Sequence, residues 1–219
     1  MSDKQPPLIL LVHGLWMSGF ELGVLKHRLE ADGQFRAVAF SYPSLTGSMA
    51  DHVNSLIEFA RAQRTDELHF VGHSLGGLVV MKALQLTDDL PDGRAVLLGT
   101  PVQGSRAARG VARLLPFGKA ILGAAVNAEI VECAPREWSG RRDIGVIAGS
   151  MGLGLGRFFA ELSTDHDGTV LVEETQLPGA RDTVVVPTSH TGMLFSAEIA
   201  TQTAHFLKHG AFKKAASGS

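Results

Sequence analysis

One serine lies between small residues, where it could do covalent chemistry. Ser74 is the centre of the G-x-S-x-G pattern GHSLG (72–76), directly after the apolar run LHFV and before the apolar segment 75–86. Between a strand and a helix this pattern is typical of a nucleophile elbow. The sharp turn brings the positions two before and two after the serine into close contact, where only glycine leaves room. The pattern therefore predicts Ser74 as a nucleophile.

A serine hydroxyl becomes nucleophilic when a base takes its proton, and histidine is the expected base. Four histidines follow the serine in the sequence: His166, His190, His205 and His209. Only His190 ends an apolar run of strand character, TVVVPTSH. His205 and His209 lie inside or at the end of the last predicted helix, and His166 is interpreted as a loop residue. We therefore predict His190 as the base.

The base needs an acid that orients it, and in a nucleophile-elbow fold that acid precedes the histidine in the chain. The segment STDHDGTV (163–170) follows the predicted strand 143–150 and contains two aspartates. Asp167 is favoured because the glycine after it permits a turn and the following valine returns to packed structure. Asp165 and Glu173 remain alternatives. An aspartate that is not used in this way is expected to cap the turn.

Acyl-transfer chemistry also needs hydrogen-bond donors for an oxyanion. The backbone N–H of Leu75 follows the nucleophile at the start of a helix, and a second donor is expected from the loop after an earlier strand. The segment LVHGLW (11–16) provides such a loop, and Leu15 would present the second N–H. His13 is expected to brace this loop through hydrogen bonds.

Apolar residues next to these positions predict an apolar substrate pocket. Trp16 follows the predicted oxyanion loop, and Met193 and Leu194 follow the predicted base. We expect these three side chains to line the pocket, with simple packing as the alternative for Trp16. Such a lining favours an acyl chain or another apolar group.

The elements that must position these residues alternate between strand and helix. Long runs of Val, Ile and Leu between helices predict an α/β fold with a mostly parallel central sheet of about six strands and helices on both faces. Right-handed crossovers place the carboxyl ends of the strands at one edge, where ligands bind in such sheets. Strands are predicted at 7–14, 36–43, 68–74, 94–101, 143–150 and 183–190, and helices at 20–33, 48–64, 75–86 and 192–210.

The segment 104–130 interrupts this alternation and is rich in Ala, Leu and Gly. Arg106, Arg109 and Arg113 have the spacing of one helical face. The favoured interpretation is a connecting helix with a solvated basic stripe. The alternative is a small lid over the site that makes transient contact with a membrane or lipid surface.

Length and composition narrow the functional classes. A chain of 219 residues suits a single domain over 1–219, and a formal net charge of −2 gives no electrostatic reason to expect a nucleic-acid partner. Cys133 is the single cysteine, so no internal disulfide is expected and a reducing compartment is favoured. Neither a signal peptide nor a membrane span is recognisable, which predicts a cytoplasmic protein. Residues 211–219 are expected to form a flexible tail.

Five segments of the sequence together resemble small lipases and esterases of the α/β-hydrolase superfamily. They are HGLW, GHSLGG, LGTPVQGS, DGTV and SHTGMLFS. The similarity extends from about residue 8 to 209 and is greatest to compact bacterial lipases and to GPI inositol-deacylase-like hydrolases. It implies an α/β-hydrolase fold with a minimal cap or none. Where the family often has a histidine after the proline of LGTP, this chain has Val102.

The resemblance implies a Ser74–Asp167–His190 triad, with Leu15 and Leu75 as oxyanion donors. It also implies hydrolysis of a small-molecule or lipid ester through an acyl-enzyme, without a metal or cofactor. An acyltransferase or a thioesterase would use the same triad and is retained as an alternative. A non-catalytic binding protein with this fold is the alternative from another class.

Overall fold

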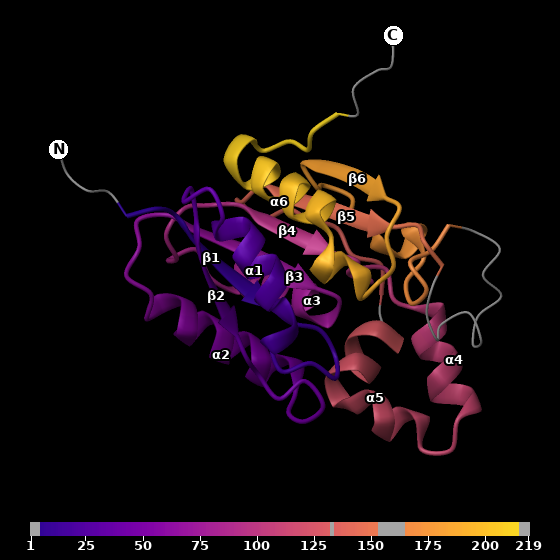
Figure 1. Cartoon of the computed structure of the whole chain (residues 1–219). Helices are drawn as coiled ribbons and strands as arrows, with labels where there is room; N and C mark the ends of the chain where they lie inside the picture. The colour runs from indigo at the N-terminus through magenta and orange to yellow at the C-terminus, as the bar shows by residue number, and fades with distance from the viewer. Residues whose placement is uncertain (1–4, 132–133, 153–164, 215–219) are drawn as a thin grey trace, which may run out of the picture.

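A six-stranded parallel sheet forms the centre of the molecule (Figure 1). The computed structural model describes residues 5–131, 134–152 and 165–214. The strands follow the order β2-β1-β3-β4-β5-β6, and every neighbouring pair is parallel, as predicted. Their bounds are β1 (Leu8–Val12), β2 (Arg36–Phe40), β3 (Leu68–His73), β4 (Ala95–Leu98), β5 (Ile144–Gly149) and β6 (Asp182–Val186).

Helices cover both faces of this sheet (Figure 1). Helices α2 (Met49–Arg61) and α3 (Leu75–Leu86) lie on one face, and α1 (Gly23–Glu30) and α6 (Ala197–His209) lie on the other. Short helical turns precede α1 at η1 (Phe20–Leu22) and β6 at η4 (Val172–Thr175). The start of α2 is set by a capping box in which Ser48 and Asp51 each accept a hydrogen bond from the other's backbone N–H.

One predicted boundary near the C-terminus is wrong. The helix predicted over 192–210 is interrupted, because η5 (Gly192–Phe195) ends before Ser196, whose hydroxyl caps α6 by accepting from the Ile199 N–H. Phe212 lies within the tail predicted as flexible from residue 211, but it is buried and its ring centroid lies 4.9 Å from that of Phe206. Residues 215–219 of that predicted tail lie outside the described residues.

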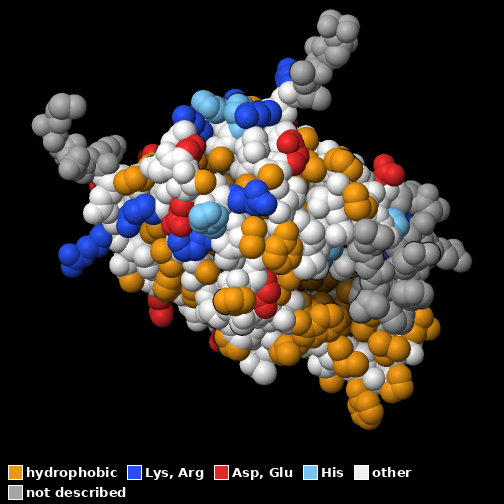
Figure 2. All heavy atoms as spheres, in the orientation of Figure 1, with side chains coloured by type: hydrophobic (Ala, Val, Ile, Leu, Met, Phe, Trp, Pro, Cys, Tyr) orange, Lys and Arg blue, Asp and Glu red, His pale blue; other side chains and the backbone are white. Residues whose placement is uncertain are grey.

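The segment 104–130 forms two helices rather than one. Helices α4 (Arg106–Leu114) and α5 (Gly118–Val126) pack on each other, and the π-helical turn η2 (Asn127–Val131) follows. The break falls at Phe117, whose backbone is left-handed (φ 59°). The pair lies apart from the helices that cover the sheet (Figure 1), and hydrophobic side chains gather on its surface (Figure 2). None of the helices in the described ranges is long and apolar enough to cross a bilayer.

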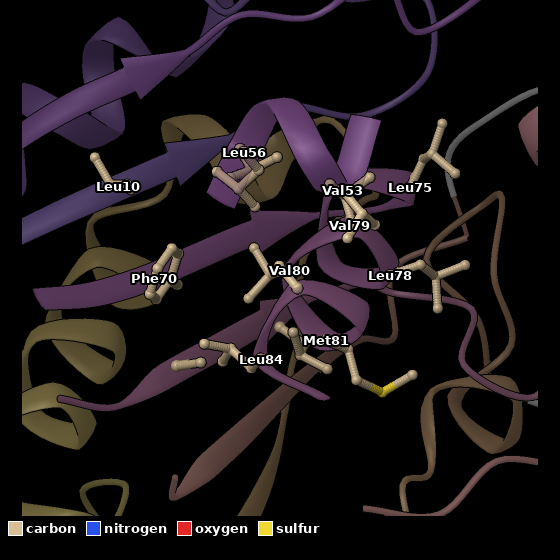
Figure 3. Packing of buried hydrophobic residues seen from close by; sticks show 14 of the residues in the cluster. Leu10, Val53, Leu56, Phe70, Leu75, Leu78, Val79, Val80, Met81 and Leu84 are labelled. Carbon is tan, nitrogen blue, oxygen red and sulfur yellow. The ribbon is translucent and has the colours of Figure 1, made fainter. Parts of the chain in front are cut away.

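Alternate side chains of β1 enter the two cores. Leu8, Leu10 and Val12 pack toward α2 and α3, whereas Ile9 and Leu11 pack toward α1 and α6. The first core is seen in Figure 3, where Leu10, Phe70 and Val80 contribute from the sheet and α3. Each large side chain buried in this way contributes about 1.5–3 kcal/mol to folding. The two cores hold the carboxyl ends of the strands in place.

Candidate active site

Ser74 occupies a strained turn between β3 and α3. Its backbone has φ 54° and ψ −123°, a conformation that residues other than glycine rarely adopt. The turn is held because the Ser74 N–H donates to the Leu98 carbonyl at 2.9 Å. A Cβ on Gly72 would lie 2.5 Å from the Gly77 Cα. One on Gly76 would overlap the carbonyl oxygens of Val12, at the end of β1, and of His13 in the following loop. The fold therefore requires glycine on both sides of the serine.

Asp167 and His190 form a buried hydrogen-bonded pair. The His190 Nδ1–H donates to Asp167 Oδ2 at 2.7 Å, and the His190 backbone N–H donates to the Asp167 carbonyl at 2.9 Å. Asp167 Oδ1 accepts from the N–H groups of Thr169 and Val170 at 2.9 and 2.8 Å. Asp167 is only 1% exposed, so the carboxylate depends on these donors for its solvation. The pair fixes the imidazole with its Nε2 directed away from Asp167.

The alternatives for the acid and base lie elsewhere. Asp165 is exposed, and Glu173 pairs with Arg106 at 2.6 Å. His166 Nδ1 accepts from the Gly168 N–H at 3.0 Å and so supports the turn after Asp167. His205 lies in the last turns of α6, where its Nδ1 is hydrogen bonded to the Ala211 carbonyl. Of the candidate acids, the structure brings Asp167 to His190.

Ser74 and His190 line one cavity of about 660 Å³. Within the described ranges, the Ser74 hydroxyl makes no hydrogen bond to the imidazole. Such bonds are often long without substrate and shorten in the reactive complex. Most of the other lining side chains are apolar. Eight of these apolar residues come from the α4–η2 region: Ala107, Ala108, Val111, Leu115, Ile121, Leu122, Val126 and Ile130.

Two backbone N–H groups are available in this cavity. Leu15 and Leu75 both line it, and neither N–H donates a hydrogen bond to another described group. The Leu75 N–H lies at the N-terminus of α3, where the helix dipole favours negative charge. Gly14 brings the first loop close to the nucleophile, because a Cβ there would lie 2.9 Å from the Ser74 Cβ. The arrangement can bind an oxyanion beside Ser74.

His13 braces the Leu15 loop, as predicted. Its Nδ1–H donates to the Gly14 carbonyl at 2.9 Å, and its Nε2 accepts from the Tyr42 N–H at 3.2 Å. The Tyr42 hydroxyl donates to the His13 carbonyl at 2.9 Å, and the two rings stack 4.4 Å apart. Burial lowers the pKa of His13, so the ring stays neutral and keeps one donor and one acceptor.

The predicted pocket residues divide into two groups. Trp16 lines the cavity mouth, and its Nε1–H donates to the Ile121 carbonyl at 3.2 Å. The prediction for Met193 and Leu194 is wrong, since both are fully buried in the core against α1 and α6. The turn η5 directs them inward, away from the cavity. A Cβ on Gly99 would lie within 3.2 Å of both Asp167 Oδ2 and the Met193 Cε, so Met193 lies beneath the Asp–His pair.

His73 is a further buried group at the site that the sequence interpretation did not single out. Its Nε2–H donates to the His190 carbonyl at 3.0 Å, and the two ring centroids lie 4.7 Å apart. Burial, together with the neighbouring His190, lowers the pKa of His73 to about 3. A neutral ring therefore holds the backbone of His190 from the side of β3. Its place next to Ser74 in the sequence was the available signal.

Glu174 is a second residue that was missed. It is buried, and its carboxylate accepts from the N–H groups of Arg106 and Leu171 at 2.6 and 2.9 Å. Burial raises the pKa of Glu174. The residue therefore joins the start of α4 to the loop that follows Asp167. Val102 is fully buried in the core.

No cluster of three or more His, Cys, Asp or Glu side chains suited to a metal ion occurs in the described part of the chain. The polar groups that line the cavity include the Ser74 hydroxyl, the His190 imidazole oriented by Asp167 and the two backbone N–H donors. This set can perform nucleophilic substitution at a carbonyl carbon.

Comparisons with known proteins agree with this fold. A model of the alpha/beta hydrolase family matches residues 9–207. A lipase of Bacillus licheniformis, BlEst2 in its mature form, superposes with a TM-score of 0.67 at 18% identity, covering 89% of each chain. The metagenomic carboxyl esterase MGS0156 has a TM-score of 0.63 at 16% identity, covering 86% of this chain and 65% of its own.

A pyrethroid hydrolase from Sphingobium faniae has a TM-score of 0.58 at 16% identity, covering 93% of this chain and 98% of its own. A comparison with curated protein sequences finds no significant match. At these identities the solved structures establish the shared fold.

Proposed function

The chain belongs to the alpha/beta hydrolase family, and within this family we propose that it is a serine hydrolase that cleaves carboxylic esters with an apolar acyl group. The observation that supports this most strongly is the buried Asp167–His190 hydrogen bond of 2.7 Å, in the cavity that Ser74 also lines. The pair supplies an oriented base where the fold presents a strained serine.

In the proposed mechanism the ester carbonyl lies between Ser74 and the N–H groups of Leu15 and Leu75. His190 Nε2 accepts the hydroxyl proton as the Ser74 oxygen bonds to the carbonyl carbon, and Asp167 stabilises the imidazolium. The two N–H groups hold the oxyanion, and each such donor lowers the barrier by about 3–4 kcal/mol. His190 then gives its proton to the leaving alcohol as the acyl-enzyme forms.

Water completes the second half of the reaction. His190 takes a proton from water, whose oxygen attacks the acyl-enzyme carbonyl, and collapse of the second intermediate returns the proton to Ser74. The apolar lining from α4, α5 and η2 supports a fatty acyl chain as the bound group. A highly polar acyl group would leave this lining without a favourable partner.

The test combines chemical labelling with a panel of p-nitrophenyl esters of increasing acyl length and one matching thioester. A fluorophosphonate probe should label the wild-type protein at Ser74 and leave Ser74→Ala unlabelled. The same substitution should lower kcat by several decades, about 10⁶-fold where triad serines have been removed. Labelling of Ser74→Ala at an equal rate, or retention of most of its turnover, would overturn the assignment.

A further inference from the structure

The turn between α4 and α5 carries a concentration of exposed apolar side chains. Leu114 and Phe117 are 68% and 84% exposed, and Leu115 and Ile121 are also exposed. We call these four residues the apolar tip. Hydrophobic side chains cover the α4–α5 region of the surface in Figure 2. Exposed apolar groups in one patch are costly in water and mark an interaction surface.

The segment that carries the apolar tip is basic, although the net charge of the chain is −2. Residues 102–128 contain Arg106, Arg109, Arg113 and Lys119 and no acidic residue. Arg106 pairs with Glu173, but Arg113, directly before Leu114, has no ion-pair partner among the described residues. The tip therefore combines exposed Leu, Ile and Phe with adjacent cations, as surfaces that bind anionic lipid do.

The tip is held in a defined shape. The Gly118 N–H donates to the Leu115 carbonyl at 2.9 Å, which closes the turn. The Asn127 side-chain amide donates to the carbonyls of Lys119 and Gly123, each at 2.6 Å, and so fastens α5. Phe117, at the turn, has a left-handed backbone and an exposed ring. An ordered apolar projection enters a bilayer surface without a further cost of ordering.

We propose that the α4–α5 turn attaches the protein to the surface of a membrane that contains anionic lipid, by insertion of Leu114 and Phe117 and contact of Arg113 with the headgroups. A second copy of the chain fits less well, because a two-fold interface through this turn would bring the cations of both copies together. The cavity mouth adjoins the same turn, since Leu115 and Ile121 belong to both. Attachment would place the mouth at the lipid surface.

The attachment itself does not rest on the proposed hydrolysis, so we would measure it with Ser74→Ala protein. The assay is co-sedimentation with vesicles of phosphatidylcholine alone or mixed with phosphatidylglycerol, at low and high salt. We expect binding to the mixed vesicles that weakens with salt. Binding that is equal on both vesicles, or absent from both, would overturn the proposal.

Matched substitutions test the surface. Leu114→Ser should weaken binding at least about tenfold, the smallest effect expected for withdrawing a large apolar side chain from lipid. Leu86→Ser should leave vesicle binding unchanged. Leu86 is a matched control because it is 65% exposed and, like Leu114, is the last residue of a helix, here α3. Arg113→Gln should weaken binding about fivefold, the effect of one basic residue near an anionic surface, while Arg28→Gln on α1 should have no effect.

Two further results would count against the proposed membrane attachment. Equal losses in Leu114→Ser and Leu86→Ser would show that the tip has no special role. Concentration-dependent dimerisation in gel filtration that Leu114→Ser abolishes, without vesicle binding, would assign the tip to contact between copies. Thermal unfolding checks that each variant is folded, and Phe117→Ser provides a second substitution at the tip.

Discussion

Replacing Asp167 with Asn separates the charge of the acid from its hydrogen bonds. Asn has one oxygen and one NH₂ group, so its side chain has two possible orientations. If the NH₂ faced Thr169 and Val170, both N–H groups would lose their acceptor, and the buried Val170 N–H alone would cost about 1–3 kcal/mol. The oxygen is therefore expected to remain in the Oδ1 position, and the NH₂ group must face His190 Nδ1.

This orientation reverses the hydrogen bond to the base. The NH₂ group of the new side chain donates to Nδ1, so the neutral imidazole carries its proton on Nε2 and has no lone pair for the Ser74 proton. Loss of the correct tautomer lowers kcat about 10⁴-fold in serine hydrolases with this triad. That factor corresponds to about 5.4 kcal/mol of transition-state stabilisation.

The assay is ester hydrolysis under saturating substrate, together with urea unfolding. Asp167→Asn should lose about 10⁴ in kcat while its unfolding free energy falls by only about 1–3 kcal/mol, since all three hydrogen-bond contacts persist without the charge. The matched control is Asp165→Asn, two residues away and exposed, which should retain wild-type activity. Activity of Asp167→Asn within tenfold of wild type, or an equal loss in Asp165→Asn, would refute the reasoning.

Three further predictions concern the scaffold around the site. Gly72→Ala should lower the unfolding free energy by at least about 3 kcal/mol in chemical denaturation, because the new Cβ overlaps the backbone. The control is Gly23→Ala, whose Cβ would have no atom within 4 Å, and its unfolding free energy should rise by up to about 1 kcal/mol. Burial, together with two nearby arginines, lowers the pKa of His69 in the folded protein to about 4. The unfolded chain therefore takes up this proton first as the pH falls. On account of His69, the unfolding free energy should fall by about 3 kcal/mol between about pH 6.5 and pH 4. His69→Gln should reduce that slope in urea titrations at a series of pH values, and an unchanged slope would exclude His69 as its source. His73→Phe should lower kcat about 10–100-fold at nearly constant KM, because it removes the hydrogen bond to the His190 carbonyl. His73→Gln keeps a hydrogen-bond donor and should recover most of this loss. A change in KM alone would contradict this role.

The sheet was predictable because its four inner strands, β1, β3, β4 and β5, are buried on both faces. Continuous apolar runs such as LILLV and AVLL are typical of the buried strands of a parallel sheet. The positions of the strands along the chain and their parallel direction could therefore be predicted. Ser74, Asp167 and His190 could be selected for the same reason, since each follows a strand at its carboxyl end. Their roles in catalysis stay predictions until the variants are measured.

Contacts between distant loops could not be predicted in this way. Met193 and Leu194 are apolar and follow His190 in the sequence, but the turn η5 rotates them into the core. The hydrogen bond from His73 to the His190 carbonyl joins residues 117 positions apart, and no periodicity encodes it. The salt bridge and backbone contacts that hold α4 depend likewise on the path of the loop after Asp167.

The left-handed backbone at Ser74 has a consequence for the protein's adaptability. A non-glycine residue at this conformation costs about 1–3 kcal/mol, so Ser74→Gly should fold more stably than the wild type while losing its nucleophile. A library selected only for heat resistance would therefore enrich inactive chains altered at position 74. Improvement of this scaffold needs selection for turnover and thermal endurance in the same round, because at this residue the two properties oppose each other.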